Sequence, residues 1–171
     1  MTVADGVALL VAGVACVTDL RSARIPNVLT FGAISAGLLF HVAAPIGAGA
    51  SEAALGLAAG LLVFFPLFAL NALGAGDVKL MAALGTWLGW RAVLSVALYG
   101  AVAGGVMALG VALWHGYLRR ALGNLRTLAA HWVLVGIKPL PELTLDAGRG
   151  LLPAAMHLPI FTGLLVTLWQ H

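Results

Sequence analysis

Residues 74–79 read GAGDVK and lie between two long apolar runs, at the end of one and the start of the next. Asp77, within this stretch, is one of only six acidic residues in a chain of 171. A carboxylate near the centre of a bilayer costs about 2.5–3.5 kcal/mol even on insertion-based scales. An acid at the edge of such a run is therefore expected to serve a function. A second acid, Asp19, ends the first apolar run, and we interpret the two acids as one candidate site.

The composition predicts an integral membrane protein of the all-α class. The chain is 62% hydrophobic and 9% charged, with a mean hydropathy of +1.06, whereas soluble domains carry about 25% charged residues. This polar surface is too small to cover a soluble globule. The single cysteine, Cys16, allows no internal disulfide. None of the five histidines has metal-ligand spacing, so we expect no metal and no cofactor.

Apolar runs divide the chain into about six predicted transmembrane helices, because about 20 apolar residues cross ~30 Å of hydrocarbon. A polar segment at 117–149 begins with an amphipathic pattern typical of a helix in the membrane interface. We expect one transmembrane domain over residues 1–171. The predicted spans are residues 2–18, 28–45, 53–73, 77–90, 92–116 and 150–169.

The basic residues predict the orientation of these spans. Arg21, Arg24, Lys79 and the basic residues of 117–149 all fall on one side of a six-span topology, which leaves only Arg91 on the other. The positive-inside rule makes the first side cytoplasmic and places both termini outside. We interpret the basic residues as topology signals rather than as a nucleic-acid surface, and we expect no nucleic-acid partner.

Counting crossings brings the two acids to one face of the membrane. Asp19 follows one predicted crossing and Asp77 follows three, so both lie on the cytoplasmic side. Counting does not show that they touch, because contact requires the first and fourth spans to be neighbours.

Small residues and tryptophans give two further expectations about the helices. The small-xxx-small patterns at 56–60 and 100–104 favour close approach of helices. Trp87 and Trp90 fit an aromatic belt at the outer interface.

Paired carboxyl groups support hydrolysis without a metal. Two carboxyl groups a few ångströms apart do not readily ionise together, so one ionised group can take a proton from water while the protonated one polarises a carbonyl. Gly74 and Gly76 lack a Cβ and would allow close approach or positive φ beside Asp77. Free N–H groups at the start of a helix would favour a negative charge there.

These motifs resemble those of the type IV prepilin peptidases. Residues 74–79 match the GxGDxK signature of that family, and Asp19 followed by Ile25-Pro26-Asn27 looks like its first aspartate region. The resemblance covers roughly residues 5–115 and is weak in the C-terminal third. It implies a multi-pass aspartic endopeptidase of the bacterial inner membrane, with Asp19 and Asp77 as the catalytic pair. It also implies prepilin or pseudopilin substrates, cut after a glycine at the cytoplasmic face.

The larger members of that family also methylate the new amino terminus and carry an N-terminal zinc-type extension with four cysteines. This chain has one cysteine, and we expect no N-terminal zinc-binding or methyltransferase extension. The chain resembles the short, peptidase-only members found with tight-adherence (Flp-type) pili, so methylation is not expected.

The remaining candidate residues have more than one interpretation. Lys79 is expected to contact a lipid phosphate, with an acidic group of the substrate as the alternative. Arg21 and Arg24 are interpreted first as topology anchors in contact with the lipid bilayer, with contact to the substrate as the alternative. Pro26, with Asn27, either begins the second span or shapes the active site.

Two other functions use the same residues. A small ion-coupled transporter could employ the acids as relay groups, although no inverted repeat is visible. A non-catalytic pilus-assembly factor could keep the fold without the activity. No oligomeric state follows from the sequence.

Overall fold

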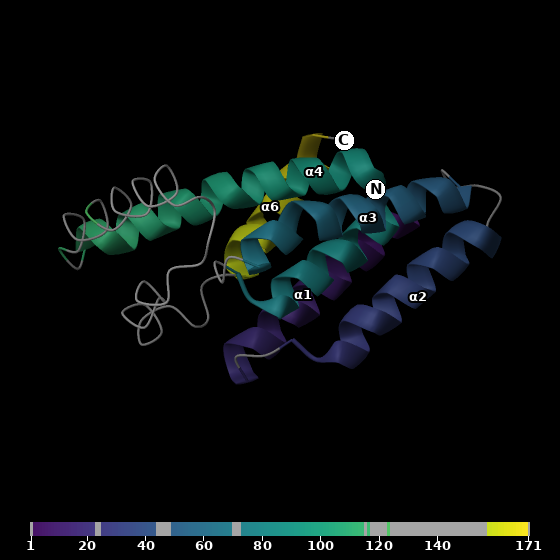
Figure 1. Ribbon diagram of the computed structural model, residues 1–171, viewed down its shortest axis with the longest axis horizontal. Coiled ribbons are helices and arrows are strands. Elements are labelled where there is room, and N and C mark those ends of the chain that lie inside the picture. The colour runs from purple at the N-terminus through teal and green to yellow at the C-terminus, as the bar shows by residue number, and fades with distance from the viewer. Residues whose placement is uncertain are drawn as a thin grey trace.

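The computed structural model describes residues 2–22, 25–43, 49–69, 73–114, 116, 123 and 157–170. All regular secondary structure within these residues is helical, as the composition predicts. The predicted interfacial segment at 117–149 lies outside the described residues, apart from Gly123. The helices are α1 (Val3–Ser22), α2 (Asn27–Ala43), α3 (Gly49–Ala69), α4 (Ala75–Trp114) and α6 (His157–Gln170) (Figure 1).

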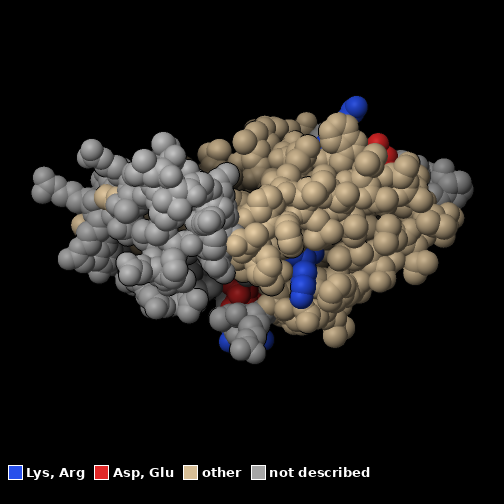
Figure 2. Space-filling model, in the orientation of Figure 1, with Lys and Arg blue, Asp and Glu red and all other residues tan. Residues whose placement is uncertain are grey.

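Two of these helices, α3 and α4, are long and apolar enough to cross a membrane. In Figure 2, the surface of the described helices is mostly uncharged, with few blue or red atoms. Large apolar side chains project from it, and Val28, Leu62 and Trp169 are 86%, 71% and 87% exposed. So much exposed apolar surface is typical of a protein that contacts lipid. The six-span topology and the positions of the termini remain predictions.

The long helix α4 changes direction at Gly89. The backbone of Gly89 has φ 80° and ψ 172°, a combination that essentially only glycine adopts without strain. In Figure 1 the chain turns back there, so the first half of α4 (residues 75–88) and its second half (90–114) are two helices. The predicted spans at 77–90 and 92–116 have their boundary within two residues of this turn.

The first half of α4 lies against α3 at backbone contact. A Cβ added to Gly56 would overlap the carbonyl of Gly85, and one added to Gly60 would overlap that of Met81. Gly85 in turn faces the Gly56 carbonyl. The close approach predicted from the pattern at 56–60 is confirmed, and its partner is α4.

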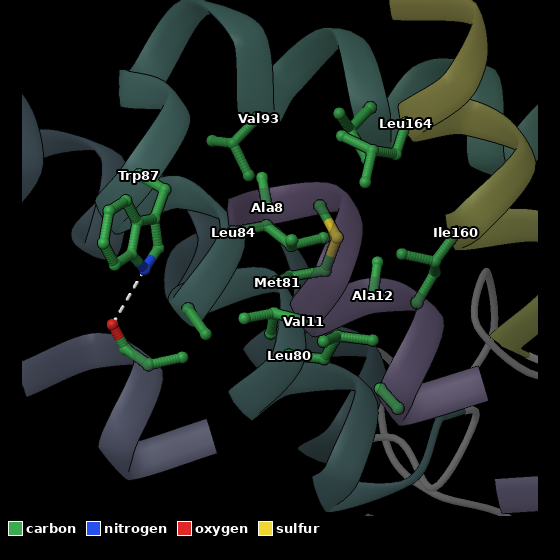
Figure 3. Packing of buried hydrophobic residues seen from close by; sticks show 14 of the residues in the cluster. Ala8, Val11, Ala12, Leu80, Met81, Leu84, Trp87, Val93, Ile160 and Leu164 are labelled. Carbon is green, nitrogen blue, oxygen red and sulfur yellow. Dashed lines mark hydrogen bonds between the residues drawn. The ribbon is translucent and has the colours of Figure 1, made fainter. Parts of the chain in front are cut away.

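The core forms where α1 and α6 pack against both halves of α4 (Figure 3). Trp87 belongs to this core: it is 7% exposed, and its indole N–H donates to the Ala33 carbonyl of α2 at 2.9 Å. The prediction that Trp87 lies in an outer aromatic belt is therefore wrong. A buried tryptophan needs an acceptor for its N–H, and α2 supplies one. The labelled core residues besides Trp87 are Ala8, Val11, Ala12, Leu80, Met81, Leu84, Val93, Ile160 and Leu164.

Candidate active site

Asp77 lies in the first turn of α4, where it caps its own helix. Its Oδ2 accepts a hydrogen bond from the Gly74 N–H at 3.2 Å, and its own N–H donates to the Gly74 carbonyl at 3.2 Å. An acid at this position commonly reaches back to the N–H of the residue before the helix. Asp77 is only 2% exposed. The carboxyl group thus lies at the positive end of the α4 dipole and accepts the Gly74 N–H.

Asp19 lies in the last turn of α1, which ends at Ser22. The sequence had predicted that the first span ends at residue 18, just before Asp19. Asp19 continues the buried face formed by Ala8, Ala12 and Ala15, because these positions recur at intervals of three and four residues. Asp19 is itself 4% exposed. Sequence position alone would have left this carboxyl group in a loop, whereas the helix directs it into the protein.

The packing of α1 on α4 brings the two acids to the same end of the bundle. The two helices run in opposite directions (Figure 1). In the core, Ala8 and Val11 of α1 lie near Leu84 and Met81 of the first half of α4 (Figure 3). Following α1 forward from this contact leads to Asp19, and following α4 backward leads to Asp77. The spans that the sequence required to be neighbours therefore are neighbours.

The α1–α2 connection reaches the same place. The Ile25 side chain lies 3.4 Å from the position that a Cβ on Gly76 would occupy. The Pro26 carbonyl accepts from the N–H groups of Leu29 at 3.1 Å and Thr30 at 3.4 Å, so Pro26 caps the start of α2, whose first residue is Asn27. Pro26 itself is exposed. The interpretation of Pro26 as a helix start is confirmed, and its neighbour Ile25 shapes the surroundings of Asp77.

Lys79 and Asn27 contact each other directly. The Lys79 Nζ donates to Asn27 Oδ1 at 2.9 Å and lies 5.4 Å from the centre of the Phe31 ring. The expected contacts of Lys79, with a lipid phosphate or with an acid of the substrate, stay predictions. Phe31 was not recognised as part of this region. Its position four residues after Asn27 was the available signal, since such residues share a helix face.

The two glycines of the motif contribute space rather than unusual backbone angles. A Cβ on Gly74 would lie 3.4 Å from Asp77 Oδ2, and one on Gly76 would press against Ile25. Among the described glycines, positive φ occurs at Gly49, Gly89 and Gly116, so the expectation of positive φ at Gly74 or Gly76 is wrong.

The other charged candidates lie outside this cluster or outside the described residues. Arg21, in the last turn of α1, is exposed, whereas Arg24 is not among the described residues. Within the described part of the chain, no group of three or more His, Cys, Asp or Glu side chains could hold a metal ion.

The contact between Ile25 and Gly76 can be tested by a disulfide. In a Cys16→Ala background, Ile25→Cys combined with Gly76→Cys should cross-link on mild oxidation. The Cβ of residue 25 lies 3.6 Å from an ideal Cβ at 76, and disulfides need Cβ atoms about 3.5–4.5 Å apart. Mass spectrometry of digested protein would detect the bond. As a control, Val28→Cys with Gly76→Cys should remain reduced, because Val28 is 86% exposed. Equal cross-linking of both pairs would contradict the described contact.

The helical architecture and its large apolar surface define a membrane-type protein with two buried carboxyl groups at one end. The chain belongs to the Type IV leader peptidase family, whose family model matches residues 6–109. That range contains Asp19, Asp77 and the α1–α2 connection.

Several curated relatives are named Prepilin leader peptidase/N-methyltransferase. One from Burkholderia pseudomallei (strain K96243) is 38% identical over 108 residues, which cover 59% of this chain and 34% of the relative. Another, from Pectobacterium carotovorum, is 36% identical over 107 residues, covering 58% and 37%. A third, from Klebsiella pneumoniae, is 42% identical over 85 residues, covering 44% and 36%. The match therefore spans about a third of each relative. No solved structure matches the chain.

Proposed function

We propose that this protein is a membrane aspartic endopeptidase that removes the leader from type IV prepilins or pseudopilins. The observation that carries the proposal is the pair of buried acids, Asp19 and Asp77, at one end of the α1–α4 interface. Membership in the Type IV leader peptidase family supports it, as does the name of the curated relatives. The family model that matches residues 6–109 describes a leader peptidase. Methylation is not part of the proposal.

Each acid has a distinct role in the proposed reaction. In the proposed reaction the Asp77 carboxylate, whose Oδ2 accepts the Gly74 N–H, takes a proton from water. The resulting oxygen nucleophile attacks the scissile carbonyl carbon while Asp19 gives its proton to the carbonyl oxygen. Asp19 then takes a proton back from one hydroxyl of the tetrahedral intermediate, the C=O bond re-forms, the C–N bond breaks, and the amide nitrogen leaves with the proton that Asp77 had accepted. The products are a new carboxylate on the leader and a new amine on the mature pilin.

The proposed setting is the bacterial inner membrane, with the acids toward the cytoplasm. The positive-inside distribution of the basic residues supports this orientation. The two described helices that are long and apolar enough to span a bilayer support the location in a membrane.

Processing of a pilin precursor tests the function. Membranes containing the wild-type protein or Asp77→Asn would be mixed with precursor in the presence of a chelator, and the size shift of the precursor would be measured. Cleavage by the wild type alone, despite the chelator, is the expected result. Cleavage by Asp77→Asn would remove Asp77 from the mechanism. If no precursor is cut but ions move across vesicles containing the protein, a transporter would replace the proposal.

A further inference from the structure

A hydrogen bond between Lys79 and Asn27 joins two segments that are distant in sequence. The Lys79 Nζ donates to Asn27 Oδ1 at 2.9 Å across 52 positions. We name this bond the Lys79–Asn27 clamp. Phe31, one turn further along α2, places its ring 5.4 Å from the same ammonium group. The cation thus has an amide oxygen and an aromatic face as partners, and both belong to α2.

The clamp connects the segments that carry the two acids. Asn27 is the first residue of α2 and closely follows Asp19 along the chain, whereas Lys79 lies in α4 just after Asp77. Ile25 adds a second contact between the same segments by packing where Gly76 lacks a Cβ. The start of α2 is therefore held against the start of α4, and the chain from Asp19 to Asn27 links this contact covalently to the end of α1.

The exposure of the clamp argues against a role in stability alone. The bond is exposed to solvent, and solvent-exposed polar contacts contribute little to the free energy of folding. Their geometric effect is different, because a displacement of about 1 Å between reacting groups can lower a rate about 10²-fold.

We propose that Lys79 is a positioning residue, which through its clamp to Asn27 fixes the placement of Asp19 relative to Asp77. The inference rests on the proposed peptidase function and deepens it. Lys79 need not touch the substrate in this role, because it acts through the α1–α2 connection. Asn27 is its necessary partner.

Cleavage kinetics with purified protein in detergent test the role. Lys79→Ala and Asn27→Ala should each lower kcat about 10- to 100-fold with KM within about twofold. The double variant should be no slower than either single variant, since both remove one contact. Lys79→Arg and Asn27→Asp should retain most of the rate, because each keeps a donor facing an acceptor. Arg21→Ala is the matched control, as it removes an exposed cation near the same end of α1 and should cleave like the wild type.

Other roles for Lys79 give different results. A contact with an acid of the substrate would raise KM in Lys79→Ala and leave Asn27→Ala unaffected. A contact with lipid phosphate would make the loss depend on anionic lipid in reconstituted vesicles. Either result, or additive losses in the double variant, would overturn the inference.

Thermal unfolding of the wild type, Lys79→Ala, Asn27→Ala and their double variant separates this inference from the proposed function. Non-additive shifts in Tm for Lys79→Ala and Asn27→Ala would show that the contact exists, whether or not cleavage is observed. If the wild type cleaves but the clamp variants cleave equally fast, the positioning role fails and the peptidase stands. If the wild type cuts no precursor, the proposed function fails, and the positioning role fails with it.

Discussion

Asparagine in place of either Asp19 or Asp77 should lower the rate of prepilin cleavage by about 10³-fold or more, and the double variant should be no slower than either single one. The reason is that the two carboxyl groups act as one unit. One group moves a proton from water and the other moves a proton to the carbonyl oxygen, so losing either stops the reaction. Residues that work as a unit show such strong non-additivity.

Single-turnover cleavage of a pilin precursor, with enzyme in excess, would measure all three variants on one scale. Asp5→Asn is the matched control, because Asp5 lies in the first turn of α1, at the opposite end of that helix from Asp19. Its carboxylate accepts the Thr2 N–H, which is a local contact at the helix start. Asp5→Asn should cleave at close to the wild-type rate. Independent losses at Asp19 and Asp77 that multiply in the double variant would show that the acids do not cooperate.

The second large effect is expected on stability, from Gly85→Ala. A Cβ at Gly85 would overlap the backbone carbonyl of Gly56. A backbone atom inside α3 cannot move aside as the end of a side chain can, so the two helices must separate. Overpacking of this kind typically costs about 1–3 kcal/mol, and with a backbone obstacle we expect about 3 kcal/mol or more in the free energy of unfolding.

Thermal unfolding in detergent would compare Gly85→Ala with Gly105→Ala, a change of the same chemistry in the second half of α4. No heavy atom lies within 4 Å of a Cβ placed at Gly105, so alanine there should be neutral or raise stability by up to about 1 kcal/mol. Equal effects at the two positions would mean that α3 and α4 do not approach at Gly85.

The sequence was sufficient to predict the helical class, the boundary near Gly89 and the position of both acids at one end of the bundle. These features depend on patterns that extend over many residues: apolar run length, crossing parity and the small-residue spacing at 56–60. The donors beside Asp77 were also predictable, because any helix leaves free N–H groups in its first turn.

The partners of individual polar side chains were not predictable. The bond from Lys79 to Asn27 was not among the expected contacts, and Trp87 was expected at an interface, yet it donates to Ala33. Both bonds depend on how α2 lies along the first half of α4. That register is fixed by tertiary packing and leaves no periodic trace in either helix.

The turn at Gly89 also determines how deep the reaction must take place. The first half of α4, residues 75–88, is about 21 Å long at ~1.5 Å per residue, which is shorter than the ~30 Å of bilayer hydrocarbon. If Gly89 lies at one interface, Asp77 falls several ångströms short of the other. Hydrophobic mismatch of this kind is relieved by local thinning of the bilayer or by a water-filled opening. A water-filled opening would leave the acids below the level of the headgroups, and on the proposed function the leader would then bend into the membrane to be cut.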